Sequence, residues 1–389
     1  MKKTMIFILA AGCFLGSYAT DARVISMGKH DAFFMDEVSV FRNPANVSIY
    51  PNMVYGSYGK FVSNDTNPQL MDPFFGVIVS YSMNEETEAG GQYPMLSLGA
   101  MCNRYDEVLD YVTPGTSNFI GGPNDTALEK PLGKFDLMLG YVLKNGVMLG
   151  AGTYIAVQDR EKDSERSETK VYKGNLGVNW PVAKTMDLEI SVGGGSITAV
   201  NKNEDLAQSD YFGRFEIRLF SALAGINGDF VPRARIDVLN IDKDNLLKVD
   251  VAAGLGLNLN IDKGFFWAGL EFLYGQEDSN SDDSKQDVGG RVSFGIERNI
   301  LWDWFVIRVG GKKSLMVKSN GVNDTYLHEN PSFDETDDDL VGLGFGINIE
   351  NRLRIDVVAS EIFPYTFSNL ISSGAQKYLF NRVSATYSF

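Results

Sequence analysis

The chain has 389 residues and a formal net charge of −15, from 35 basic and 50 acidic side chains. This acidic balance argues against nucleic-acid binding through phosphate contacts. No run of 18 apolar residues occurs after residue 20, so we expect no membrane-spanning helix. The 40 glycines, 17 tyrosines and 25 phenylalanines, with only 12 prolines, are typical of a large all-β structure with tight turns.

The first 19 residues predict a cleaved signal peptide. Lys2 and Lys3 form a positive n-region, residues 5–15 form an apolar h-region, and Ser17-Tyr18-Ala19 offers small cleavage residues. We expect processing after Ala19, so that the protein is exported. Removing the two lysines leaves 33 basic and 50 acidic residues, a net charge of −17.

The cysteines allow a second interpretation of the N-terminus. Ala10-Ala11-Gly12-Cys13 resembles a lipobox, in which Cys13 would carry a lipid, although the apolar run continues past it. Cleavage after Ala19 would instead remove Cys13 and leave Cys102 without an intramolecular disulfide partner. The sequence leaves lipidation of Cys13 open.

Three short motifs follow in order: Asp21-Ala22-Arg23, Met27-Gly28 and Asn43-Pro44-Ala45. Pro44 lacks an amide donor and has a fixed φ, so Asn43-Pro44 predicts a turn and not a ladder-paired strand. The Asn43 side chain can bond the local backbone of such a turn.

In this order and position, the motifs resemble the entry segment of the FadL/PorV-like outer-membrane β-barrel family, and their spacing is closer to its PorV side. The resemblance covers about thirty residues. It implies a barrel of fourteen strands over residues 52–389, with residues 20–51 folded inward as a periplasmic hatch. Arg42 and Asn46-Val47 depart from the family pattern, so ligand chemistry is not carried over. A tail that caps the barrel base without gating it is the simpler alternative.

From residue 53 onward, period-2 alternation predicts strands with one apolar and one polar face. Segments of about ten residues suit tilted strands that cross a bilayer. We therefore predict an all-β, transmembrane, antiparallel up-and-down β-barrel, with sixteen strands by count against the fourteen that the resemblance implies. The segments are 53–61, 74–82, 96–103, 134–143, 147–157, 171–179, 187–198, 211–221, 230–239, 248–261, 265–274, 288–297, 305–313, 341–349, 353–359 and 381–389.

The connections alternate in length, as those of an outer-membrane barrel do, with short periplasmic turns and long external loops. The short links are 144–146, 181–186, 262–264 and 350–351, and the long ones are 104–132, 158–170, 275–287, 314–340 and 361–379. The link 83–93 is longer than this rule predicts.

Several segments carry charges on one face only. A lipid-facing arginine near the bilayer midplane would cost about 2–4 kcal/mol, so we predict that these charges line the lumen. Because both signs are present, cross-strand pairs can neutralise them. The residues are Arg214, Glu216, Arg218, Arg233, Arg235, Asp237, Arg352, Arg354 and Asp356.

The last segment has an apolar face that ends in Tyr387 and Phe389 and a polar face headed by Arg382. In an exported chain this pattern predicts the closing strand of a barrel, with Tyr387 and Phe389 as its C-terminal assembly signal. A soluble edge strand is the alternative for this segment alone.

Catalytic and metal-binding patterns are weak. The two histidines, His30 and His328, lie in the N-terminal segment and in a long link, so we expect no enzyme and no cofactor. Asp278, Asn280 and Asp282 have the spacing of a calcium loop, but Asp283 and Gly289 replace its required glycine and glutamate. We interpret this stretch and the acidic run 334–339 as solvated loops, without a metal. Gly193-Gly194-Gly195 predicts a β-bulge.

The sequence thus predicts a non-enzymatic outer-membrane protein with a transport or secretion-linked role. Its expected partners are outer-membrane lipid and the barrel-assembly machinery, together with exported cargo or a secretion machine if the chain is PorV-like. The alternatives are a FadL-like channel for small hydrophobic molecules and a structural envelope protein. The charged lumen weakens a fatty-acid assignment.

Overall fold

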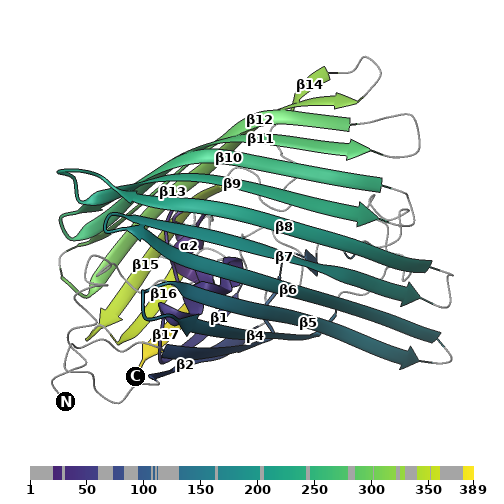
Figure 1. Cartoon of the computed structure of the whole chain (residues 1–389), viewed down its shortest axis with the longest axis horizontal. Coiled ribbons are helices and arrows are strands. Elements are labelled where there is room, and N and C mark those ends of the chain that lie inside the picture. The colour runs from purple at the N-terminus through teal and green to yellow at the C-terminus, as the bar shows by residue number, and fades with distance from the viewer. Residues whose placement is uncertain are drawn as a thin grey trace, which may run out of the picture.

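The computed structural model describes most of the chain as one antiparallel sheet that curls around short helical segments (Figure 1). The described residues are 21–28, 31–59, 73–82, 95–106, 108, 109, 112, 131–162, 165–201, 206–241, 246–278, 285–300, 302–320, 325–328, 340–350, 352–359 and 380–389. The predicted signal peptide, the Cys13 lipobox and His30 lie outside these residues. Among the described helices, none has the length and apolar character needed to cross a membrane.

The wall consists of short strands on one side and long strands on the other. The first short strands are β1 (Met53–Gly59), β2 (Phe74–Ser82), β3 (Met95–Cys102) and β4 (Gly133–Val142). The long strands are β5 (Met148–Lys162), β6 (Glu165–Ala183), β7 (Met186–Asn201), β8 (Leu206–Ala222), β9 (Gly228–Ile241), β10 (Leu246–Ile261), β11 (Gly264–Asp278), β12 (Lys285–Asn299) and β13 (Phe305–Asn320). The chain continues through β14 (Thr325–His328), β15 (Leu340–Ile349), β16 (Leu353–Ala359) and β17 (Phe380–Ser388).

Sixteen of these described strands form a closed ring. β17 pairs with β16 on one side and with β1 on the other, where Tyr55 lies opposite Thr386. β15 pairs with β13, and β14 adds a short ladder to the last residues of β13. The predicted count of sixteen strands is confirmed, and the fourteen implied by the family resemblance is not what this wall contains.

The two faces of the wall differ in polarity, as β11 illustrates. Leu270 and Phe272 are 59% and 53% exposed on the outer face, whereas Glu271 between them is 2% exposed inside the barrel. In the register of the sheet, Leu255 and Val292 flank Leu270 on the neighbouring strands and are also exposed. The strands therefore alternate apolar outward and polar inward.

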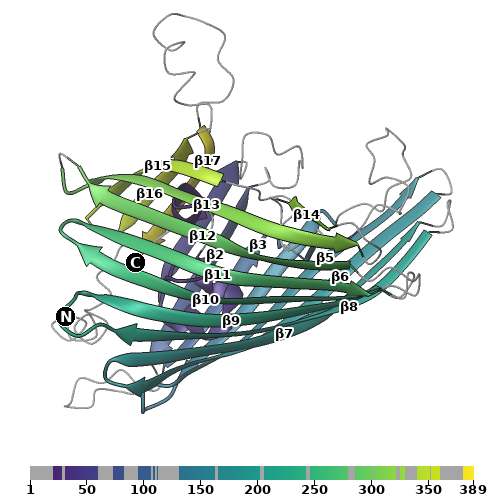
Figure 2. The ribbon, with the colours of Figure 1, turned by 90° about the horizontal axis from the view of Figure 1, so that it is seen from above.

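The barrel has two distinguishable ends. The near end carries the last residue, where the Phe389 amide donates to the Asn52 carbonyl oxygen at 3.0 Å. Short links at 143–147, 184–185, 223–227 and 262–263 lie at this near end, and the opposite end is called the far end. Figure 2 shows the long strands running obliquely between the two ends.

The long strands extend further toward the far end than the sequence predicted. The link expected at 158–170 is largely strand, because β5 and β6 remain paired as far as Lys162 opposite Glu165. β11, β12 and β13 likewise extend into the expected links 275–287 and 314–340, and β14 was not predicted at all. Ladder hydrogen bonds join backbone groups, so pairing continues where the apolar face ends.

The bulge predicted at Gly193-Gly194-Gly195 is wrong. Register runs without a shift through these residues in both the β6–β7 and β7–β8 ladders, and the irregularity lies instead between Pro181 and Ala183. The close approach of a neighbouring side chain explains Gly193 better, since a Cβ at this position would lie 2.1 Å from the Asn175 side-chain oxygen.

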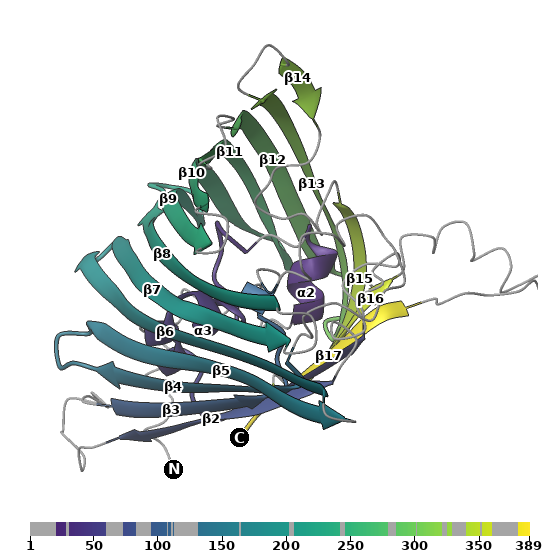
Figure 3. The same cartoon turned by 90° about the vertical axis from the view of Figure 1, so that its right-hand side faces the viewer.

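Three short helical segments of the described chain lie inside the ring (Figure 3). They are α2 (Asp21–Ser26), α3 (Ser39–Arg42) and the 3-10 helix η1 (Pro44–Ser48). α2 contacts β13, β15, β16 and β17, whereas η1 contacts β3, β4, β5 and β6. The described residues of the segment 20–51, which we call the hatch, therefore touch opposite parts of the inner wall.

Candidate functional site: the hatch and its seat in the wall

Glycines in the wall make room for the hatch backbone. Gly295, Gly310 and Gly342 are direct neighbours across β12, β13 and β15. A Cβ on Gly310 would lie 2.1 Å from the Met27 carbonyl carbon, and one on Gly342 would lie 2.5 Å from the Ile25 carbonyl oxygen. Side chains in this row would thus exclude the segment around Met27 from the wall.

Two further parts of the hatch also lie against wall glycines that leave room for them. Gly256 and Gly269 face each other across β10 and β11, and a Cβ on either would lie within 2.5 Å of the Phe33 ring. A Cβ on Gly150 would lie 2.1 Å from the Ala45 amide nitrogen. We call the part of the inner wall that contacts the hatch its seat. The seat and the hatch are complementary in shape at these three places.

The first hatch residues bind the seam where β17 meets β1. The Asp21 amide donates to the Tyr55 hydroxyl at 3.0 Å, and the Ala22 amide donates to the Ser384 hydroxyl at 3.1 Å. The Asp21 carboxylate also forms an ion pair with Arg382. The start of α2 is thus fixed to the strands that close the ring.

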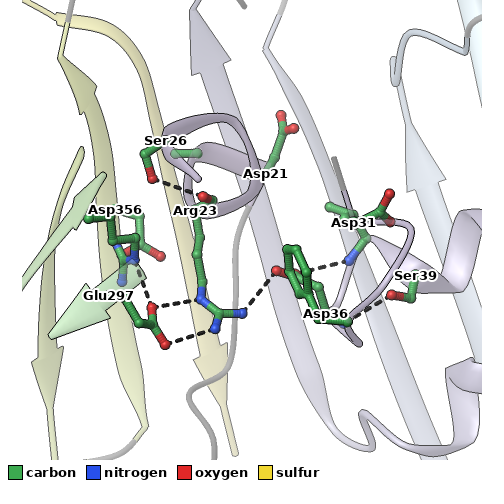
Figure 4. Close-up of polar contacts among 12 residues, drawn as sticks. Asp21, Arg23, Ser26, Asp31, Asp36, Ser39, Glu297 and Asp356 are labelled. Atoms are coloured by element: carbon green, nitrogen blue, oxygen red, sulfur yellow. Dashed lines mark hydrogen bonds and ion pairs between the residues drawn. The ribbon is translucent and has the colours of Figure 1, made fainter. Parts of the chain in front are cut away.

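Arg23 is the centre of a buried charge network (Figure 4). Its guanidinium donates two hydrogen bonds of 2.8 Å to Glu297 in β12 and one of 3.2 Å to Asp36 in the hatch. Arg308 donates to Glu297 at 2.9 Å and pairs with Asp356 at 2.7 Å. Opposite charges are therefore paired between side chains that are almost fully buried, where screening by solvent is weak.

A second set of contacts holds the middle of the hatch to the opposite wall. Arg42 pairs with Glu216 in β8 at 2.7 Å and also with Asp31. Arg218 donates to the backbone carbonyl oxygens of Asp31, Ala32 and Phe34 at 3.1, 3.3 and 3.3 Å. These bonds satisfy polar backbone groups that the hatch buries without regular secondary structure.

The predicted Asn43-Pro44 turn is confirmed. Asn43 caps η1, since its side-chain oxygen accepts from the Ala45 amide at 3.1 Å and Pro44 occupies the first turn. The Asn43 side-chain amide also donates to the Val178 carbonyl oxygen in β6 at 3.2 Å. One side chain thus shapes the hatch and attaches it to the wall.

Gly28, which follows α2, has a φ of 97°, a backbone conformation that favours glycine.

Two adjacent carboxyl groups are buried in the hatch. Burial raises the pKa of Asp36 to about 6, although the Arg23 guanidinium favours the charged form. Burial also raises the pKa of Glu37 well above its usual value; the Asp36 carboxylate adds to this shift and Arg354 opposes it. The seated hatch therefore favours protonated carboxyl groups at this point.

The attachment of the hatch to the inner wall is expected to weaken as the pH rises. A carboxyl whose pKa is higher in the seated hatch than in water stabilises the seat while protonated, and this stabilisation is lost as the pH rises through the raised value, about 6 for Asp36. Amide exchange in residues 31–48, corrected for its intrinsic pH dependence, should increase around pH 6, where Asp36 loses its proton. It should increase again at the higher pH where Glu37 loses its proton. Glu37→Gln should abolish the second increase, whereas Asp303→Asn, in an exposed turn, should change neither.

Most of the predicted lumen charges lie inside the barrel. Asp237 accepts a hydrogen bond from Arg214 at 2.5 Å and forms an ion pair with Arg235 at 2.6 Å, whereas Arg233 pairs with Glu216 at 3.2 Å and Glu271 at 2.9 Å. Arg218 donates to Glu189 at 2.8 Å, and Arg354 pairs with Asp356 at 2.9 Å. Arg352 differs, because it lies exposed in the turn before β16 and takes no part in the network.

Sequence reasoning missed Glu297 and Glu189, the wall carboxylates that accept hydrogen bonds from the hatch residues Arg23 and Asn46, and also Arg308, which pairs with Glu297. A usable signal exists for Glu297, which shares the inward parity of Arg291 and Ser293 in β12. Tyr387 is exposed on the outer face of β17 and Phe389 is exposed just beyond its end. His328 lies in β14.

The described residues hold no cluster of three or more side chains suited to a metal ion. Asp278 ends β11, where its carboxylate accepts from Gln276. Gly289 lies in β12, whereas Asn280, Asp282, Asp283 and the acidic run 334–339 lie outside the described residues.

Comparisons with known proteins return only solved structures. No protein-family model and no curated protein matches the chain. OmpT, an outer membrane protein of Vibrio cholerae, is 11% identical with a TM-score of 0.37, covering 86% of this chain and 94% of its own. CdiB from Acinetobacter baumannii is 11% identical with a TM-score of 0.41, covering 87% and 59%. BamA from Haemophilus ducreyi lacking POTRA domains 1-3 is 9% identical with a TM-score of 0.40, covering 86% and 69%.

Proposed function

We propose that the chain is a bacterial outer-membrane β-barrel, exported by a signal peptide at residues 1–19, with a hatch over 20–51 and a barrel over 52–389. The proposal rests on the distribution of polarity across the wall. Large apolar side chains such as Leu255, Leu270 and Val292 are exposed outward on adjoining strands, which suits lipid, while charged side chains are buried inside. The barrel-assembly machinery would act on Tyr387 and Phe389.

This location is tested by fractionating cells and running the outer-membrane fraction, heated and unheated, on a detergent gel. We expect a membrane-bound band whose migration changes with heating, as a folded barrel unfolds. A band confined to the soluble periplasm would contradict the proposal.

We further propose a secretion-linked role of the PorV type, in which a closed barrel binds exported cargo or a secretion machine. This role is supported by the ion pairs that hold the hatch inside the barrel: Arg23, Arg42 and Asp21 each pair with a charged side chain of the wall. Opening such a lumen requires breaking buried charge pairs, which disfavours free passage of solute.

The secretion role is tested by cross-linking in cells and purification from membranes. We expect exported proteins or components of a secretion machine to be captured with the barrel. Isolation of the barrel alone, together with unchanged secretion in a deletion strain, would argue against the role.

A FadL-like passage for small hydrophobic molecules is the second candidate. It is favoured by an apolar patch on the inner wall, formed by Val171, Ile197 and Ala199 and covered by Val108 and Leu109. Ordered detergent at this patch and uptake into liposomes would support it, whereas absence of uptake would leave the secretion role. A purely structural envelope protein would show neither uptake nor captured partners.

A further inference from the structure

A second segment folds into the lumen from the far end. It belongs to the β3–β4 connection, and its described residues are 103–106, 108, 109 and 112; we call it the inward segment. Asn103 has φ of 65°, and its amide donates to the Lys134 carbonyl oxygen at 2.8 Å as the last bond of the ladder. The chain leaves the wall after this residue.

Apolar contacts hold the inward segment against the inner face of the long strands. Val108, Leu109 and Val112 are buried against Tyr154, Ala156, Val171, Ile197 and Ala199. The Asp106 carboxylate accepts from Lys173 in β6 at 3.0 Å and from the Val108 amide at 3.1 Å. The segment therefore has apolar and polar anchors of its own on the wall.

Arg104 connects this segment to the hatch. Its guanidinium donates two hydrogen bonds to Asp136 in β4, at 3.0 and 2.7 Å, and one to Asp106 at 2.7 Å. The guanidinium carbon lies 4.1 Å from the centre of the Phe41 ring in α3. Asp136 in the wall and Asp106 in the inward segment together fix the plane of the guanidinium over Phe41, and the backbone of Arg104 belongs to the inward segment.

Little free space separates the two elements. The cavity bordered by Val40, Phe41, Arg104, Asp136 and Tyr154 has a volume of only about 10 Å³, which is at the limit for one water molecule. Neither element can therefore move far toward the other, and a displaced Arg104 leaves one face of Phe41 without its partner.

We propose that the inward segment is a second internal closure of the barrel, and that Arg104 couples it to the hatch. Displacing the inward segment moves Arg104 off Phe41 and loosens α3 and η1; displacing the hatch in turn loosens the inward segment. Contacts made at the far end thereby affect the closure at the near end. This coupling is independent of whether the barrel serves secretion or uptake.

The test measures thiol labelling of a Ser48→Cys reporter in a Cys102→Ser background. Ser48 lies in η1 and is buried, and its hydroxyl oxygen has no hydrogen-bond partner among the described residues, so the replacement is conservative. Leu109→Asn removes an apolar anchor of the inward segment at a distance from the reporter. We expect it to speed labelling on the order of tenfold, the size of effect expected from a buried cation–π contact.

Adding Phe41→Leu removes the coupling contact. In this background Leu109→Asn should change the labelling rate by less than about twofold, because movement of Arg104 no longer reaches the hatch. Heat-modifiable migration verifies folding, and Val112→Asn replaces Leu109→Asn if that variant fails to fold. Labelling that is insensitive to Leu109→Asn, or equally sensitive with and without Phe41→Leu, would overturn the coupling.

Discussion

An Arg23→Met variant is expected to fold its barrel but to lose the protected state of its hatch. Methionine keeps much of the apolar volume but removes three hydrogen bonds, two to Glu297 and one to Asp36. Breaking a buried ion pair by removing one partner costs about 3–5 kcal/mol. Amides in residues 21–48 should therefore exchange at least about a hundredfold faster, as measured by hydrogen exchange and mass spectrometry.

Arg352→Met is the matched control. It removes the same charge from an exposed turn, where surface substitutions change stability by about 0.5 kcal/mol or less. Hatch exchange in this variant should equal that of the wild type. An Arg23→Met hatch that stays as well protected as the control would show that the charge network does not hold the seat.

A Gly310→Ala variant is expected to displace the hatch by steric exclusion. The added Cβ would lie 2.1 Å from the Met27 carbonyl carbon, which is backbone and cannot rotate away as a side chain can. Overpacking of this kind typically costs about 1–3 kcal/mol, so hatch exchange should rise about 5- to 150-fold while the wall ladders stay intact.

Gly174→Ala provides the control for this effect. It introduces the same methyl group into β6 at a site where nothing lies within 4 Å of the new atom. Exchange in the hatch should be unchanged. If both glycine variants behave alike, the glycine row at 295, 310 and 342 is not a seat for the hatch.

Much of the wall could be predicted from the sequence because strand identity depends on local alternation. Every one of the sixteen predicted segments overlaps a strand. The charged face of β8 and β9 was visible for the same reason, since Arg218 and Arg233 alternate with apolar residues. The prediction that Arg352 faces the lumen was wrong. Arg352 has the same alternation as Arg354, but β16 begins only at Leu353, so Arg352 lies in the turn before the strand.

The seat of the hatch could not be predicted in the same way. The pairing of Arg23 with Glu297 joins residues 274 positions apart, and depends on the register of β12 and on the path of α2. The glycines at 295, 310 and 342 have no distinguishing local pattern, and become a row only when three strands are aligned. The inward segment was assigned to a long link, because its burial depends on side chains from β5, β6 and β7.

Hydrogen exchange of the wild-type protein in outer-membrane vesicles tests whether the hatch is seated in the lumen of a barrel that is embedded in the outer membrane. We predict that amides in residues 21–48 exchange nearly as slowly as those in the wall strands β10 to β13. Exchange of these hatch amides at the rate of an unstructured peptide, while the wall stays protected, would contradict the account.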